Sequence, residues 1–196
     1  MNHIVLDIET QNLFSDVGGK ENLTKLLLSV AGVYSYSDGE FLTFTEKEIP
    51  AFESLLKKTD LIIGFNINHF DLPVLQKYLT VDLSKIPALD IMNEVINTMG
   101  HRVSLDDLVS NTLGKRKSAN GLMAVEYWRE GRMDELKKYC LDDVRLTRDL
   151  YEHGLKNGEI KFTARDANLP YVKTLKINWS KYSNFKTETA WTPSLF

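Results

Sequence analysis

The first apolar run of the chain constrains its fold more than any other feature. His3–Ile8 has the composition of a buried strand, yet it delivers two carboxylates, Asp7 and Glu9, at its end. Burying a charge without a partner is expensive, so the pair either lies at a solvated strand end or receives a cation. Because the two acids are two residues apart on a strand, they project to the same face.

The elements that follow predict a mixed sheet covered by helices. Asp38-Gly39 between the β-formers of 28–37 and 41–45 predicts a hairpin. Helical spacing and short apolar runs then alternate along the chain. Helices are predicted at 21–27, 46–60, 73–79, 104–113, 122–130 and 134–153, and further strands at 61–65 and 86–91.

Strands joined by helical crossovers predict an α/β domain, whose sites lie at the carboxyl ends of parallel strands. Residues 1–158 are expected to form this domain. Residues 159–196 are expected to add a hairpin, EIKFTAR paired with TLKINW around Asn168-Leu169-Pro170, and a polar tail packed on the same domain.

Composition narrows the class of protein without fixing its function. The 196 residues are 43% hydrophobic and 26% charged, as in soluble globular proteins. No apolar run reaches the length of a membrane helix, and no secretory signal is visible. Cys140 is the only cysteine, so no internal disulfide can form. These features lead us to expect a cytoplasmic location. The net charge of −3 lacks the usual basic footprint of nucleic-acid binding, although metal-binding acids can mask a local basic patch.

A second acidic motif is GFNINHFDLP, which contains Asp71. Asp is a common helix cap, so one interpretation is that Asp71 caps the helix beginning near Pro73. If Pro73 is the first helical residue, however, the cap position is Leu72, and Asp71 lies one place too early.

The third motif, KYCLDDV, lies in the last long helix. Tyr139 and Asp143 are one turn apart on the same face, and Asp143 falls inside the apolar stripe while Asp142 falls outside it. An acid inside a core-facing stripe costs stability unless it is paired or binds a metal. The stripe consists of Leu136, Tyr139, Cys140, Leu146, Thr147 and Leu150.

Four acids gathered in one place would repel one another unless cations were present. Oxygen ligands suit Mg²⁺ or Mn²⁺, whereas zinc favours His and Cys. A pair of such ions would activate a water and stabilise the leaving oxygen in phosphodiester cleavage. The acids concerned are Asp7, Glu9, Asp71 and Asp143.

DIET, GFNINHFD and YCLDD, in this order, resemble the three motifs of the four-acid (DEDD) 3′–5′ exonucleases with a ribonuclease H-like fold, in the branch with a tyrosine in the third motif. The second motif is similar to that of family B DNA polymerase proofreading domains. The whole chain is similar to stand-alone exonuclease domains, some of which occur beside helicases. The resemblance covers about residues 1–155 and leaves Gly158–Phe196 unmatched.

The resemblance implies a two-metal site with the four acids as ligands and Tyr139 orienting the attacking water. It also implies that Thr10, Asn66 and Phe70 contact the terminal nucleotide, although core packing is the alternative for Phe70. A basic loop at 114–121 is a candidate for backbone binding, and a solvated loop is its alternative. The basic residues are Lys115, Arg116 and Lys117.

The predicted function is metal-dependent 3′–5′ exonuclease activity on single-stranded DNA or RNA ends. A helicase or another DNA repair protein is a predicted partner. Two alternatives stay open: a non-catalytic module that docks nucleic acid or a helicase, and a structure-specific endonuclease on the same fold.

Overall fold

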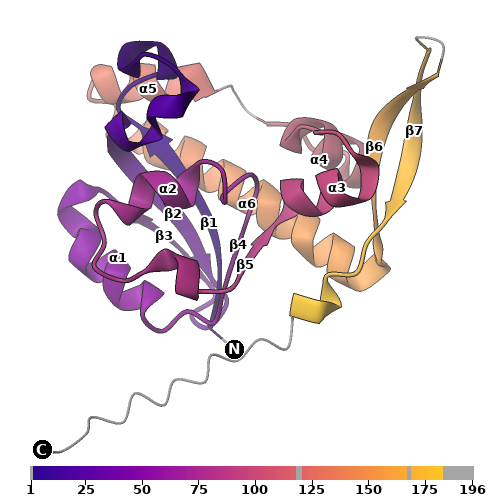
Figure 1. Cartoon of the computed structure of the whole chain (residues 1–196), viewed down its shortest axis with the longest axis horizontal. Coiled ribbons are helices and arrows are strands. Elements are labelled where there is room, and N and C mark those ends of the chain that lie inside the picture. The colour runs from indigo at the N-terminus through magenta and orange to yellow at the C-terminus, as the bar shows by residue number, and fades with distance from the viewer. Residues whose placement is uncertain (1, 118–120, 167–168, 183–196) are drawn as a thin grey trace, which may run out of the picture.

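The structure is a computed structural model and describes residues 2–117, 121–166 and 169–182. Asn168 and the predicted tail beyond residue 182 lie outside the described residues. Figure 1 shows a central sheet with helices on both sides and a separate hairpin standing next to α4.

The sheet has five strands in the order β3-β2-β1-β4-β5, so the amino-terminal strand is central. β1 pairs in parallel with β4, and β4 with β5, while β2 is antiparallel to both β1 and β3. The predicted mixed sheet and its Asp38-Gly39 hairpin are confirmed. The strands are β1 (His3–Thr10), β2 (Leu28–Ser35), β3 (Glu40–Phe44), β4 (Leu61–Gly64) and β5 (Ala88–Asp90).

Six α-helices accompany the sheet within the described residues. Ser104 caps the fourth of them, because its hydroxyl accepts the Asp107 N–H at 3.2 Å. The predicted helix at 21–27 is instead a 3₁₀ segment, Lys20–Lys25. The helices are α1 (Ile49–Leu56), α2 (Asp71–Gln76), α3 (Ile91–Met99), α4 (Leu105–Leu113), α5 (Gly121–Arg129) and α6 (Met133–Asn157).

Helix α3 was not predicted, and the strand expected at 86–91 is shorter than expected. It ends at Asp90, whose carboxylate accepts the N–H groups of Met92 and Asn93 and thereby caps α3. An Asp at this position starts a helix where the apolar composition alone favours a continued strand.

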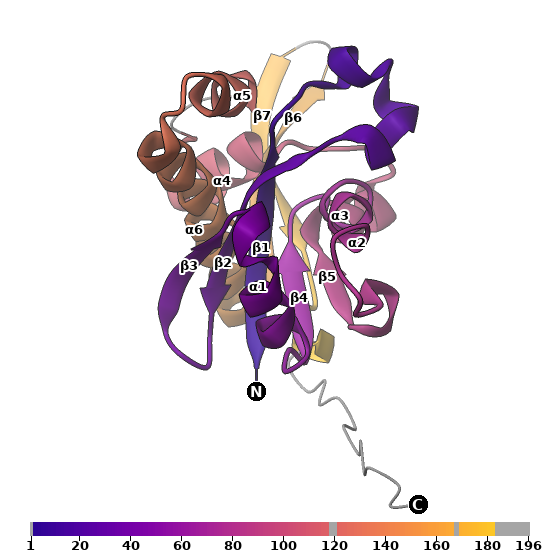
Figure 2. The same cartoon turned by 90° about the vertical axis from the view of Figure 1, so that its left-hand side faces the viewer.

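Side-chain alternation along β1 divides the core between the two faces of the sheet. Ile4, Leu6 and Ile8 pack in the cluster that contains α1 and α2 residues, whereas Val5 packs in the cluster that contains α6 residues. Figure 2 looks onto the face that α1 covers. Asp7 and Glu9 continue the row of Val5 and so face the α6 side.

The carboxy-terminal hairpin pairs β6 (Glu159–Asp166) with β7 (Leu169–Lys176), which confirms the predicted hairpin. Its second strand begins five residues earlier than the TLKINW segment that starts at Thr174. Ile160, Phe162 and Leu175 are buried in the same core cluster as residues of α4 and α6, so the hairpin shares the core of the sheet domain.

Candidate active site

Helix α6 approaches the sheet closely where β2 carries a glycine. Gly32 pairs with Asp7 in the register of β1 and β2, and a Cβ on Gly32 would lie 2.7 Å from the Cys140 sulfur. The sulfur itself lies 3.5 Å from the Asp7 carbonyl oxygen. The missing side chain therefore lets α6 lie directly over the acids of β1.

This close packing brings three carboxylates together. Oxygens of Asp7, Glu9 and Asp143 all lie within 4.8 Å of one another. Asp143 is only 5% exposed, whereas Asp142 lies on the outer side of α6 and pairs with Arg145 at 2.6 Å. Such a group of oxygens fits a hard divalent cation, which prefers carboxylate ligands.

Asp71 lies next to this group and is held by the backbone of β1. It is the first residue of α2, and the N-cap position belongs to Phe70, so the interpretation of Asp71 as the cap is wrong. Instead its Oδ1 accepts the N–H of Ile8 at 2.9 Å, and the residue is 2% exposed. This bond fixes a fourth carboxyl group beside the residues Asp7 and Glu9.

The pKa values of these acids are perturbed by burial and by mutual repulsion. The pKa values of Asp7 and Glu9 are both raised well above their ordinary values. Burial is the largest cause, and the charge of Asp143 is the second. Burial also raises the pKa of Asp71 to about 7, against the lowering effect of the Ile8 hydrogen bond. Ionising these acids together is therefore unfavourable without a cation, and a bound divalent cation would remove that penalty.

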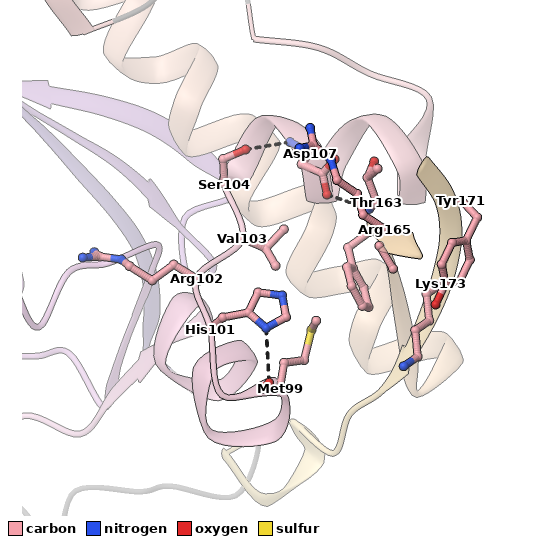
Figure 3. Close-up of a pocket in the computed structure, with 12 residues that line it drawn as sticks. Met99, His101, Arg102, Val103, Ser104, Asp107, Thr163, Arg165, Tyr171 and Lys173 are labelled. Carbon is pink, nitrogen blue, oxygen red and sulfur yellow. Dashed lines mark hydrogen bonds between the residues drawn. The ribbon is translucent and has the colours of Figure 1, made fainter. Parts of the chain in front are cut away.

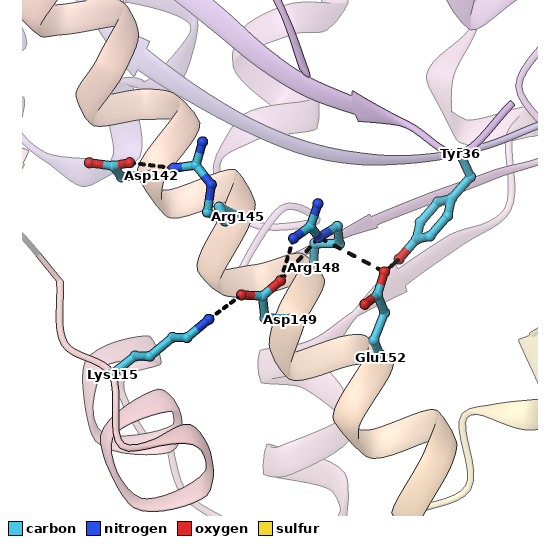
Figure 4. A network of polar contacts seen from close by, with 7 residues as sticks. All are labelled: Tyr36, Lys115, Asp142, Arg145, Arg148, Asp149 and Glu152. Carbon is cyan, nitrogen blue, oxygen red and sulfur yellow. Dashed lines mark hydrogen bonds and ion pairs between the residues drawn. The ribbon is translucent and has the colours of Figure 1, made fainter. Parts of the chain in front are cut away.

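The three basic residues of the 114–121 loop point to different places. Lys117 enters the acid site, where its ammonium lies 2.6 Å from Asp143, and its side chain is 27% exposed. Lys115 instead pairs with Asp149 at 2.6 Å (Figure 4). Arg116 lines a surface pocket with Asp142 and Arg145 rather than the acid site.

One cavity of about 410 Å³ contains the acid site and the residues expected to contact a nucleotide. Phe70 packs edge-on against Phe14, with ring centroids 5.7 Å apart, and both line this cavity. The lining also includes Asp7, Glu9, Thr10, Asn66, Asp71, Lys117, Tyr139 and Asp143.

Tyr139 is 4% exposed and lies among these acids. Burial, followed by the charges of Asp143, Glu9 and Asp7, raises the pKa of its phenol. The phenol is therefore protonated at neutral pH and is available as a hydrogen-bond donor rather than as a base.

Asp90 organises the second motif, and the sequence did not single it out. Its two carboxylate oxygens accept the N–H groups of Asn66 at 2.8 Å and Asn68 at 3.0 Å. The bond to Asn66 holds this residue in a left-handed conformation with φ of 65°. Asp90 ends the strand next to β4, and an acid at that carboxyl end is the signal that could have identified it.

A model of the RNase H superfamily matches residues 4–154 of the chain. A search among curated proteins finds no match. Among the described residues, no helix combines the length and apolar composition of a membrane span. The matched range contains all four acids and both faces of the sheet, and it ends before the hairpin.

Proposed function

Because the chain belongs to the RNase H superfamily, we propose that it is a metal-dependent exonuclease that removes nucleotides from the 3′ ends of single-stranded nucleic acids. The convergence of Asp7, Glu9 and Asp143 within 4.8 Å is the observation that carries the proposal. The 3′–5′ direction rests on the resemblance of the three sequence motifs to those of the four-acid exonucleases.

The donor set suits two ions of Mg²⁺ or Mn²⁺. Asp7, Glu9 and Asp143 would hold them, with Asp71 as the fourth ligand through the carboxylate that also accepts the Ile8 N–H. When bound, the ions would supply an activated water and charge stabilisation for the leaving oxygen. All four ligands offer oxygen only, which favours these hard cations over zinc.

Tyr139 and Lys117 have complementary roles in this proposal. The protonated phenol of Tyr139 donates a hydrogen bond that positions the attacking water, since its raised pKa excludes service as a base at neutral pH. The Lys117 ammonium, now 2.6 Å from Asp143, pairs with the phosphate that enters the site. Both residues act on the reacting groups from the same cavity.

The size of the cavity agrees with a single nucleotide at the strand end. Its volume of about 410 Å³ falls within the roughly 300–1,000 Å³ of typical small-ligand sites. Thr10, Asn66 and Phe70 line it beside the acids and would contact the sugar or the base. Whether DNA or RNA is preferred depends on contacts to the 2′-hydroxyl.

Matched DNA and RNA oligonucleotides test the proposal. Linear strands with a free 3′ end, strands with a blocked 3′ end and circles are each incubated with Mg²⁺ or Mn²⁺. We expect stepwise shortening from free 3′ ends alone, and none with Asp143→Asn. Cleaved circles would identify an endonuclease instead, and binding without degradation would identify a non-catalytic docking module.

A helicase or another repair protein stays a predicted partner, and pull-down with the intact chain tests it.

A further inference from the structure

A second cavity, of about 720 Å³, lies between the carboxy-terminal hairpin and the segment that joins α3 to α4. Figure 3 shows His101 and Val103 on one wall and Tyr171 and Lys173 on the opposite wall. We call this cavity the hairpin groove. Among the described residues, its lining shares none with that of the cavity at the acid site.

The hairpin groove is lined by cationic side chains. Arg165 and Lys173 are both exposed, and neither makes an ion pair with any residue that the structure describes. Of the described residues around the groove, only Asp107 is acidic. Its Oδ2 already accepts the Thr163 N–H at 2.8 Å, and its Oδ1 accepts from the Asn111 amide at 3.2 Å. Arg165 and Lys173 alone outnumber this one acid, so the net charge of the described side chains that line the groove is positive.

An exposed aromatic ring accompanies these charges. Tyr171 is 47% exposed and lies on the same face of β7 as Lys173 and the buried Leu175. Because Leu175 packs into the core, this face of β7 looks toward the protein and into the groove. Tyr171 thus shares its face with one cation, Lys173, while Arg165 lines the groove from the neighbouring strand. Aromatic rings combined with cations are the means by which proteins bind single strands without sequence preference.

One side chain connects the hairpin groove to the acid site. Arg102 lines the groove, and its guanidinium donates a hydrogen bond to the Asn66 side-chain oxygen at 2.6 Å. Asn66 in turn lines the cavity that contains Asp7 and Glu9. A strand whose last nucleotide occupies the acid site therefore reaches the groove by passing Arg102.

We propose that the hairpin groove binds the part of a single-stranded nucleic acid that lies 5′ of the nucleotide being removed. Arg165 and Lys173 pair with its phosphates, and Tyr171 stacks on one of its bases. The inference rests on the proposed function, because it assumes that the 3′ end lies at the acids. It adds a substrate-binding role for the hairpin, which lies outside the matched family range.

Binding of fluorescent oligonucleotides by the full chain tests the groove. Anisotropy is measured in EDTA, so that no cleavage occurs, with single-stranded DNA and RNA of about three and about twelve nucleotides. The variants are Arg165→Ala/Lys173→Ala and Tyr171→Ala. The control is Lys161→Ala, which removes the same charge from an exposed position of β6 outside the groove.

We expect Tyr171→Ala to weaken binding of the twelve-nucleotide strand about tenfold or more. The double variant should reduce the salt slope of log K by about 0.7 for each lost phosphate contact. Lys161→Ala should change neither quantity, and the three-nucleotide strand should be affected little by any variant. Melting curves establish that each variant is folded, and Lys173→Arg should retain the wild-type slope.

Two results would contradict the proposed binding role of the hairpin groove. Either the wild-type chain binds the longer strand no better than the shorter one, or the groove variants behave like Lys161→Ala. Failure of the proposed exonuclease looks different, because the longer strand would then bind through the groove but would not be degraded when Mn²⁺ is added.

Discussion

Helix α6 carries two groups of carboxylates in opposite surroundings. On its outer side two carboxylates have cationic partners: Asp142 pairs with Arg145 at 2.6 Å, and Asp149 with Arg148 at 2.7 Å (Figure 4). On its inner side Asp143 meets Asp7 and Glu9 within 4.8 Å, with Lys117 as the ammonium ion-paired to it.

The difference shows that balance of charge, rather than number of acids, marks a functional site. Asp142 and Arg145 form one pair, whereas Asp149 belongs to a chain of contacts that runs through Arg148 to Glu152 and the Tyr36 hydroxyl. Ion pairs near the protein surface contribute little to stability. Among the described residues, the inner group holds more buried carboxyl groups than cations, and ionising them costs stability unless a further cation binds. Substitutions in the outer group can therefore serve as controls for substitutions in the inner group.

The largest expected effect separates two neighbouring residues of α6. Asp143→Asn should lower the rate of nucleotide release by more than about 100-fold, because even changes to residues behind a metal ligand cost 10–100-fold. Asp142→Asn should leave the rate within about twofold. Steady-state assays and calorimetric titration with Mn²⁺ measure both effects. Wild-type activity in Asp143→Asn would remove the acid site from the mechanism.

Gly32→Ala tests the close approach that creates the inner group. The added Cβ would meet the Cys140 sulfur at 2.7 Å, and overpacking of this kind costs roughly 1–3 kcal/mol of unfolding free energy. Removing the sulfur in Gly32→Ala/Cys140→Ala should recover part of the loss. Gly121→Ala, whose new Cβ would have no atom of the described residues within 4 Å, is the control. Urea denaturation measures all three, and an unaltered Gly32→Ala would contradict the packing argument.

Two lysines of one loop test the comparison through the substrate. Lys117→Ala should slow nucleotide release by about 10- to 100-fold, since a charge-assisted contact to a phosphate contributes about 1.5–3 kcal/mol. Lys115→Ala, which removes one of the cationic partners of Asp149, should leave the rate unchanged. Rates are compared at low salt, where charge effects are largest. Equal losses in the two variants would favour a diffuse basic loop over a specific role for Lys117.

The smallest effect is a pH dependence of stability with opposite signs in the two groups. The pKa of Asp71 is raised from its ordinary value of 3.8 to about 7 in the folded chain. Its contribution to the free energy of unfolding is therefore complete below pH 3.8 and is lost as the pH rises to about 7. Burial tends to raise the pKa of Asp149, but hydrogen bonds from Lys115 and Arg148 outweigh burial and lower it. The contribution of Asp149 to the free energy of unfolding is therefore lost only as the pH falls through the lowered pKa of this residue.

In EDTA we therefore expect a higher melting temperature at pH 5 than at pH 7.5, by about 5 °C. Mn²⁺ should remove the difference, because it binds the ionised acids of the folded chain. Asp149→Asn should preserve the difference. Melting temperatures that are equal at both pH values without metal would contradict the penalty for ionising the inner acids together.

The sequence predicted those parts of the site that depend on local periodicity. Alternation on the first strand placed Asp7 and Glu9 on one face, and the helical stripe distinguished the buried Asp143 from Asp142. The fold class followed in the same way from the order of strands and helices.

Features that depend on contacts between distant segments were missed or misread. Asp71 was open to interpretation as a cap because its partner, the Ile8 N–H, comes from another element. The role of Asp90 depends on Asn66, and that of Gly32 on Cys140, so neither is visible in a local pattern. Three-dimensional packing, rather than propensity, decides these cases.

The position of Lys117 also affects how the site takes up metal. Its ammonium is ion-paired to Asp143 at 2.6 Å, so the arrival of a divalent ion is an exchange of one cation for another. The apparent dissociation constant then measures a competition between the metal and the chain's own lysine. A chain with such an internal counter-ion can complete its folding before metal is supplied, and free metal concentration becomes a switch for activity rather than for assembly.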